Sequence, residues 1–289
     1  MPTKIEKDMV SGTDTTGHEW DGIKELNTPL PTWWVYVFYA TILFAIVYAV
    51  LFPSVPGLHS YYKGLLGYST RAVLAQSLKA EAAQRAPMMN KIEATSVGDI
   101  AKNPDLLNFA LAGGRAVFAE NCAPCHGPGG AGNPHFPNLT DDDWLWGGDI
   151  GNIYTTIRYG IRNSNPSSRQ SMMPRFLADG ILKPEQINDV AEFVLSLTKR
   201  STDAQAVERG AKIFADNCAA CHGDKGQGNI EVGSKNLTNG IWLYGGDKKT
   251  IVQTISYARN SSMPAWSQRL DDATIKMLAV YVHSLGGGK

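Results

Sequence analysis

The stretch Gly114-Arg-Ala-Val-Phe-Ala-Glu-Asn-Cys-Ala-Pro-Cys-His-Gly127 decides the fold, because it recurs as Gly210-Ala-Lys-Ile-Phe-Ala-Asp-Asn-Cys-Ala-Ala-Cys-His-Gly223. The similarity continues through Asn-Leu-Thr, Trp-Leu-x-Gly-Gly-Asp and Met-Pro segments in the same order. A segment that recurs in this way indicates copies of one structural unit. The sequence therefore predicts two copies of one domain in tandem.

Both copies are predicted to be helical. Apolar residues recur at helical spacing, and Asp149 and Asp247 follow Gly-Gly pairs where they can cap further helices. No convincing alternation of apolar and polar residues indicates strands, so the domains are predicted to be all-α. The expected helices that open and close the copies are residues 105–121, 184–197, 202–217 and 271–285.

All four cysteines lie in two Cys-x-x-Cys-His motifs. This motif is the attachment signature of c-type haem, because two thiols one helical turn apart can reach both vinyl groups of one porphyrin, and the histidine can ligate the iron. A zinc site would need a fourth ligand, and a thioredoxin-like site would need a βαβ setting. The sequence predicts two covalent haem c groups, held by Cys122, Cys125 and His126 and by Cys218, Cys221 and His222.

Each copy also offers a methionine for the other side of the iron. Met173 and Met263 both precede a proline at matching places in the repeat, and Met172 is the neighbouring alternative. Histidine–methionine ligation raises the reduction potential and fills the coordination sphere, so electron transfer is expected rather than O₂ binding. We assume that each methionine serves the haem of its own domain, although exchange between domains is geometrically conceivable.

One segment is predicted to span a membrane. Residues 33–52 are almost wholly apolar, and twenty helical residues span about 30 Å. Prolines flank the segment on both sides, and an aromatic cluster begins it. A cleaved signal peptide is the alternative interpretation. However, the segment before the apolar stretch is long and contains more acidic than basic residues, which favours a retained anchor.

The overall charge excludes one class of partner. Lys and Arg total 27, as do Asp and Glu, so there is no basic excess for a nucleic acid. Residues 54–104 are predicted to be a connector with a helix over 69–85, which Pro87 ends. This connector could lie on the membrane surface, lie against a partner subunit, or be a plain spacer.

Several other residues have weaker signals. We expect His135 to be an ordinary polar loop residue, although it could approach the first haem. Asn138 and Asn236 match a glycosylation sequon, but their place in the repeat indicates a structural loop. The aromatic residues expected to line the haem pockets are Trp144, Trp242, Tyr159 and Tyr257.

The two domains resemble class I cytochromes c. In that family a glycine and a phenylalanine on the first helix pack against an aromatic residue on the last helix. The matching first-helix residues here are Gly114 and Phe118 in one copy and Gly210 and Phe214 in the other. Phe193 and Tyr281 are the candidates for the aromatic partners.

The leader His18-Glu-Trp-Asp-Gly-Ile-Lys-Glu-Leu-Asn-Thr-Pro-Leu-Pro-Thr-Trp-Trp34 extends the resemblance to nearly the whole chain. It resembles the dihaem subunit (subunit III) of the cbb3-type cytochrome c oxidases. The resemblance implies a subunit without an active site of its own in a proton-translocating complex. Electrons would come from a donor cytochrome c and pass through the monohaem cytochrome c subunit to the haem–copper subunit. It assigns the roles of covalent attachment and axial ligation to Cys122, Cys125, His126, Met173, Cys218, Cys221, His222 and Met263.

Haem c is attached outside the cytoplasmic membrane in such bacteria. The expected location is therefore the bacterial inner membrane, with one span and with the haem domains in the periplasm. The predicted divisions are a cytoplasmic segment 1–29, an anchor 30–53, a connector 54–104, and cytochrome c domains 105–200 and 201–289. A cytochrome subunit of a periplasmic dehydrogenase, a free-standing anchored cytochrome, and a haem-based gas sensor are the alternatives.

Overall fold

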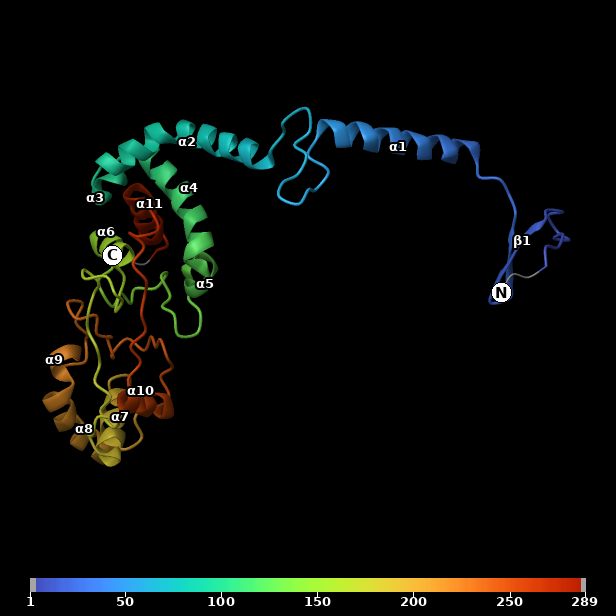
Figure 1. The fold of residues 1–289 in the computed structure, drawn as a ribbon. Coiled ribbons are helices and arrows are strands. Elements are labelled where there is room, and N and C mark those ends of the chain that lie inside the picture. Colours follow the sequence, from blue (N-terminus) through green and yellow to red (C-terminus); the bar gives the residue numbers. More distant parts are fainter. Residues whose placement is uncertain (1–3, 287–289) are drawn as a thin grey trace. The chain divides into compact units, whose positions relative to one another are not determined.

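The computed structural model describes residues 4–286 (Figure 1). The chain divides into two compact units, with the division between Ala82 and Ala83. The first three residues of the predicted segment 1–29 and the last three of the predicted domain 201–289 lie outside the described residues. The described chain is mostly helical, as the sequence predicts.

The first unit begins with a small hairpin. Strands β1 (Thr15–Trp20) and β2 (Ile23–Leu26) pair antiparallel. The turn residues Asp21 and Gly22 have φ values of 51° and 87°, which is the left-handed region that a two-residue hairpin turn requires. These strands are too short for their alternation to be recognised, but Asp-Gly is the usual signal for such a turn.

Helix α1 (Thr32–Leu51) follows, and none of its residues is buried within the protein. Among the residues that the structure describes, it is the one helix long and apolar enough to cross a membrane. A helix that is apolar on every side and has no buried residue has the character of a membrane span. The chain then folds back so that the amides of Leu65 and Leu66 donate to the carbonyls of Val50 and Leu51, at 3.0 and 3.1 Å.

Helix α2 (Thr70–Ala94) corrects one prediction, because it continues through Pro87. Proline removes one backbone donor from a helix, which usually ends or kinks it. Packing offsets this cost here, since the last turns of α2 place Ile92 in a buried cluster of the second unit, with Met88 and Met89 against it. The end of the connector is therefore part of the folded unit and not a plain spacer.

The second unit contains the repeated sequence. The predicted opening and closing helices are confirmed to within two residues at each end. Asp149 accepts hydrogen bonds from the amides of Gly151 and Asn152, and Asp247 accepts one from Thr250, so both predicted caps are present. The elements are α3 (Val97–Ile100), α4 (Pro104–Asn121), α5 (Ala123–His126), the 3₁₀ turn η1 (Pro128–Gly130), α6 (Ile150–Tyr159), α7 (Pro184–Ser196), α8 (Ala204–Asn217), α9 (Ala219–His222), α10 (Lys248–Tyr257) and α11 (Asp272–His283).

These helices form two groups, and the groups differ from the two sequence copies. In the first helix group, α3 to α6 pack with α11, which comes from the other end of the chain. In the second helix group, α7 packs against α8 and α10, next to the short α9 (Figure 1). The last helix of each copy has thus changed places with its counterpart. The second helix group is continuous in sequence, and the first is interrupted by it.

Each group has its own buried core. The core of the first group includes Phe118, Ile157 and Leu278, which come from α4, α6 and α11. The core of the second group includes Val194, Phe214 and Ile255, which come from α7, α8 and α10. Each core therefore combines side chains from both sequence copies.

Candidate haem sites

The two Cys-x-x-Cys-His motifs adopt the same local structure. Cys122 ends α4, and one further helical turn, α5, brings Cys125 and His126 back beside it: the amides of both donate to the Cys122 carbonyl, at 3.1 and 2.9 Å. Cys218, Cys221 and His222 repeat this arrangement at α9, with the same two distances. Each motif thus presents two thiols and an imidazole from one tight helical turn, as the spacing predicts.

The tautomer of each motif histidine is set by a backbone carbonyl. Nδ1 of His126 lies 3.0 Å from the carbonyl oxygen of Pro137, and Nδ1 of His222 lies 2.9 Å from that of Lys235. Burial lowers the pKa of both imidazoles, which favours the neutral form. A neutral imidazole that donates from Nδ1 keeps the lone pair of Nε2 for a metal. Both histidines are prepared as ligands.

The first cysteine of each motif lies further inside than the second. Burial raises the pKa of the Cys122 and Cys218 thiols to about 11, while Cys125 and Cys221 are exposed. One thiol in each motif therefore lies at a core and the other at the surface.

A large cavity adjoins the second motif. Its volume is ≈ 610 Å³, and its walls include Cys218, Cys221, His222 and Met173. Loop residues 131–138 of the first copy close part of it. This volume is in the range of about 300–1,000 Å³ that ligand and cofactor sites occupy, so the site is large enough for a cofactor and carries the expected side chains.

Each methionine packs in the helix group that contains the haem motif of the other copy, which differs from our assumption. Met263 packs against the core of the first helix group, as Cys122 does, whereas Met173 packs against the core of the second group, which contains Cys218. The assumption that each methionine lies with the haem motif of its own copy is therefore wrong for the packing. The physical reason is the exchange of α7 and α11, since each methionine precedes the helix that has changed places.

The two methionine segments also bind the opposite copy through their backbones. Met263 exchanges two hydrogen bonds with Ile161, at 2.9 and 3.0 Å, and its carbonyl also accepts from Nδ2 of Asn163 at 2.8 Å. Asn260 accepts from the Met173 amide at 3.1 Å and donates to the Met173 carbonyl at 3.2 Å. Asn163 and Asn260 were not predicted, although each belongs to an Arg-Asn-Ser triplet that follows the Ile-x-Tyr segment in both copies.

The glycine, phenylalanine and aromatic contacts expected of class I cytochromes c are present in exchanged form. The rings of Phe118 and Tyr281 lie 5.4 Å apart, and those of Phe214 and Phe193 lie 4.9 Å apart. A Cβ atom on Gly114 would lie 2.4 Å from the carbonyl oxygen of Met277. Glycine is therefore needed for the close approach of α4 and α11.

Among the other predicted pocket residues, Trp242 is confirmed in a cavity wall, and for Trp144 the structure shows packing against a core. Trp144 packs against the first core and Trp242 against the second, and Trp242 also lines the cavity. Both buried indole N–H groups have no hydrogen-bond partner among the described residues. A buried donor without an acceptor is costly, so both positions suit an acidic group of a cofactor.

The remaining aromatic and loop residues have mixed outcomes. Tyr257 is 57 % exposed and is not in the cavity wall, so its expected place is wrong. Tyr159 is partly buried and lies under the guanidinium of Arg158. His135 lies 5.6 Å from the ring of Tyr244 in the other copy, which fits a loop residue at the junction between copies.

The Asn-Leu-Thr segments are structural loops, as predicted. Oδ1 of Asn138 accepts hydrogen bonds from the amide and hydroxyl of Thr140, at 2.9 and 2.8 Å. Asn236 and Thr238 repeat this turn at 2.9 and 2.7 Å. These loops follow the carbonyls that accept from the motif histidines.

Three family models match separate parts of this chain. Residues 12–59 match the family described as the N-terminal domain of cytochrome oxidase-cbb3, FixP, and residues 111–198 match the cytochrome c family. Residues 205–282 match the family described as cytochrome c oxidase, cbb3-type, subunit III.

Full-length relatives give the same result. The cbb3-type cytochrome c oxidase subunit CcoP of Azospirillum brasilense is 56% identical over 98% of this chain and 99% of its own length. The subunit FixP of Bradyrhizobium sp. (strain ORS 278) is 54% identical over 100% of both chains. CcoP of Cereibacter sphaeroides is 49% identical, again over 100% of both. With two cytochrome c domains and two haem c groups, the chain belongs to the CcoP/FixP family of cbb3-type cytochrome c oxidase subunits.

Proposed function

We propose that this subunit transfers electrons from a donor cytochrome c, through its two haems, to the monohaem cytochrome c subunit of the oxidase. From there the electrons reach the haem–copper subunit, where O₂ is reduced. The observation that supports this most is the pairing within each core, where one Cys-x-x-Cys-His motif shares a helix group with one methionine. The subunit itself has no catalytic role in this proposal.

The ligand sets follow from the packing of the methionines. We assign His126 and Met263 to the haem bound by the first motif, and His222 and Met173 to the haem bound by the second. When bound, each haem would supply a one-electron redox centre, and a methionine sulfur used with a histidine nitrogen as ligands would favour its reduced form. The cysteines hold the porphyrin, and the backbone carbonyls that accept from the histidine Nδ1 atoms orient the imidazoles. Trp144 and Trp242 offer N–H donors to the haem carboxylates.

The membrane anchor and the haems give the subunit its orientation. The chain is membrane-anchored through α1, which has the length and apolar character of a span. Because c-type haem is attached outside the cytoplasmic membrane, we place the second unit in the periplasm and residues 4–29 in the cytoplasm. This orientation makes the haems accessible to a soluble donor.

The native membrane complex tests the function. After purification through a tag on this subunit, we expect two haem c groups per chain, with b-type haem, copper and donor-dependent O₂ consumption in the same fraction. Isolation with a dehydrogenase, or without copper and b-type haem, would contradict the oxidase assignment. CO binding at both reduced haems of the unmodified chain would contradict the closed ligand sets and favour a gas sensor.

A further inference from the structure

Three positions at which the sequence copies differ come together in space. Alignment on the two Asn-Leu-Thr segments places Lys235 where the first copy has Pro137, and Asn239 where it has Asp141. On the other side, Asp143 occupies the place at which the second copy has Ile241. The residues Asp143, Lys235 and Asn239 form a closed set of contacts, which we call the polar ring.

The contacts of the polar ring are short and complete. Nζ of Lys235 lies 2.7 Å from Oδ2 of Asp143 and 2.9 Å from Oδ1 of Asn239. Nδ2 of Asn239 donates to Oδ1 of Asp143 at 2.6 Å, which closes the ring. The side chains of Lys235 and Asp143 are only 16% and 13% exposed, so their charges are poorly screened by water.

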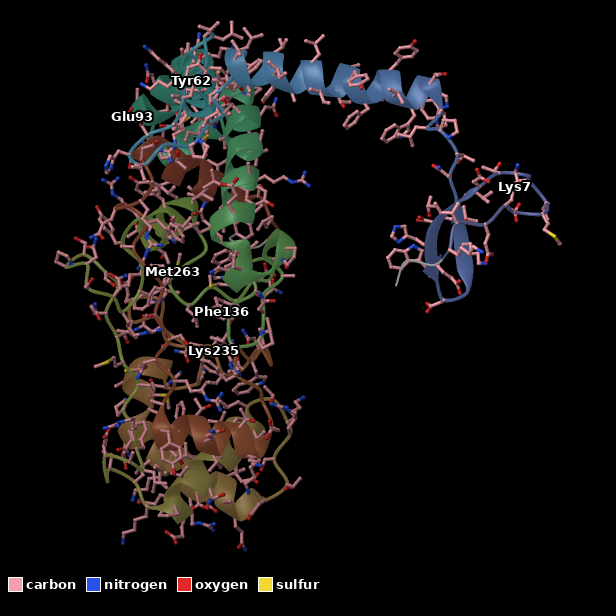
Figure 2. All side chains as sticks on the ribbon, turned by 45° about the vertical axis from the view of Figure 1, so that its right-hand side comes forward. Lys7, Tyr62, Glu93, Phe136, Lys235 and Met263 are labelled. Atoms are coloured by element: carbon pink, nitrogen blue, oxygen red, sulfur yellow. The ribbon has the colours of Figure 1, made fainter. Side chains whose placement is uncertain are left out.

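The polar ring lies beside the second haem site and has no equivalent at the first. The carbonyl of Lys235 accepts from Nδ1 of His222, and both Lys235 and Asp143 line the cavity that Met173 also lines. Figure 2 shows Lys235 among the loops between the two helix groups. At the first site, the carbonyl that accepts from His126 belongs to the uncharged Pro137. The other acidic or basic side chains of the cavity wall, besides His222, are Asp141, Arg162 and Arg259.

We propose that the two charges of the polar ring act in opposite directions on the reduction potential of the second haem, and not on that of the first. This inference rests on the proposed function, since it requires a redox-active haem at each motif. Reduction adds one negative charge to the haem, so the Lys235 cation favours the reduced form and the Asp143 anion opposes it. Held 2.7 Å apart, the two charges largely cancel. Asn239 bonds to both Lys235 and Asp143 and so holds the two charged groups in place without adding a charge.

The test is a pair of single substitutions with opposite expected signs. In the full-length subunit with both haems attached, Lys235→Met should lower the potential of the second haem, and Asp143→Asn should raise it. The expected size is about tenfold in the ratio of reduced to oxidised haem, or about 59 mV, because each variant leaves one poorly screened charge. The double variant should return close to the parent value, and the first haem should not change.

Potentiometric titration followed by absorbance supplies the measurement, and a chain with Cys218→Ser and Cys221→Ser identifies the wave of the first haem. The matched control is Lys102→Met, which breaks the exposed ion pair with Asp99 outside the cavity and should shift neither wave. Lys235→Arg keeps the charge and should keep the potential. These two variants separate charge from general disturbance of the fold.

Three outcomes would overturn the proposal. Shifts of the same sign in Lys235→Met and Asp143→Asn would indicate loosened structure rather than charge. Equal shifts at both haems, or shifts no larger than that of Lys102→Met, would show that the ring does not act on the second haem specifically. A parent chain without two one-electron waves would instead contradict the proposed function.

Discussion

At the scale of single residues, the two methionines show that position in the repeat does not reveal which haem motif a methionine packs with. Met173 and Met263 occupy equivalent places in the repeat, yet each packs with the haem motif of the other copy. Asn163 and Asn260 donate hydrogen bonds to the carbonyls of Met263 and Met173, and Asn260 also accepts one from the Met173 amide. The packing of each methionine is therefore set by contacts with the other copy, which its position in the repeat does not reveal.

A single substitution distinguishes exchanged ligands from ligands within a copy. Met173→Ala should lower the potential of the haem bound by Cys218 and Cys221, since the thioether that favours the reduced form is lost. We expect a fall of more than tenfold in the equilibrium constant for reduction, beyond about 59 mV, in a potentiometric titration of each haem. The first haem should be unchanged.

The adjacent Met172 offers a matched control for this substitution. It is 74% exposed, and Met172→Ala should leave both potentials at their parent values. A fall confined to the first haem in Met173→Ala would show that each methionine serves its own copy. Unchanged potentials at both haems would remove Met173 from the ligand set altogether.

At the scale of elements, the two helix pairs α4–α11 and α7–α8 use the same device. A glycine on the opening helix lets the backbone of the closing helix approach. One turn further along, an aromatic residue of the closing helix packs against a phenylalanine of the opening helix. On Gly210, a Cβ atom would lie 2.1 Å from the carbonyl oxygen of Asp189, which is backbone and has no room to move aside. These contacts hold each closing helix on the opening helix of the other copy.

Adding one methyl group should measure the closeness of this crossing. Gly210→Ala should destabilise the second helix group by about 1–3 kcal/mol, the usual cost of overpacking, seen as a lower urea midpoint with an unchanged slope. Gly98→Ala is the control, because no atom lies within 4 Å of its Cβ position and alanine favours a helix. Equal midpoints for the two variants would contradict the close packing.

The contact between α7 and α10 contributes a pH dependence. Glu192 is 2% exposed and pairs with Lys248 at 2.7 Å. The hydrogen bond from Lys248 is the largest cause that lowers the pKa of Glu192 from its ordinary value of 4.5, followed by that from Ser201. A pKa lowered by folding gives stability that is fully present above the unfolded pKa and is lost as the pH falls through the folded one.

Glu192→Gln should remove this acid dependence. The parent should lose stability as the pH is lowered from about 4.5, while the variant should be less stable than the parent at neutral pH and show a flatter profile in the acid range. Denaturant titrations at a series of pH values measure both effects. Glu208→Gln, at an exposed position on α8, should keep the parent profile, and identical slopes for all three proteins would contradict the role of Glu192.

At the scale of the whole molecule, the individual helices and haem motifs were predictable from the sequence. Which opening helix packs with which closing helix was not. Helical periodicity, capping aspartates and motif spacing are local, so they identify the opening and closing helices and both haem motifs correctly. The exchange is not local: Phe193 and Tyr281 fit either opening helix equally well by type.

Two shorter features were also beyond a periodicity argument. The hairpin of β1 and β2 has strands too short to show alternation, although Asp21-Gly22 marks its turn. Pro87 predicts a helix end by its chemistry, but burial of Ile92 and its neighbours keeps the helix intact beyond it. In both places tertiary context decides what local preference leaves open.

The exchange determines which piece of the chain folds alone. The second helix group, its haem motif and Met173 are all contained in residues 172–260, and the amide of Phe176 closes this segment on the carbonyl of Ile255 at 3.2 Å. Residues 201–289, the second sequence copy, have the same length but lack α7 and Met173. A fragment of residues 172–260 should therefore attach one haem and unfold cooperatively, and its potential should differ from that of the second haem in the intact chain only by the shift expected for loss of Asp143, a rise of about tenfold, or about 59 mV. A fragment of residues 201–289 should expose the faces of α8 and α11 that their partners cover, and should aggregate or hold haem with a lower potential.

Circular dichroism, haem content and potentiometry of the two fragments measure this difference. If residues 201–289 gave the potential expected of residues 172–260, and residues 172–260 did not, the copies would fold as the sequence divides them, and the exchanged packing of α7 and α11 would be wrong.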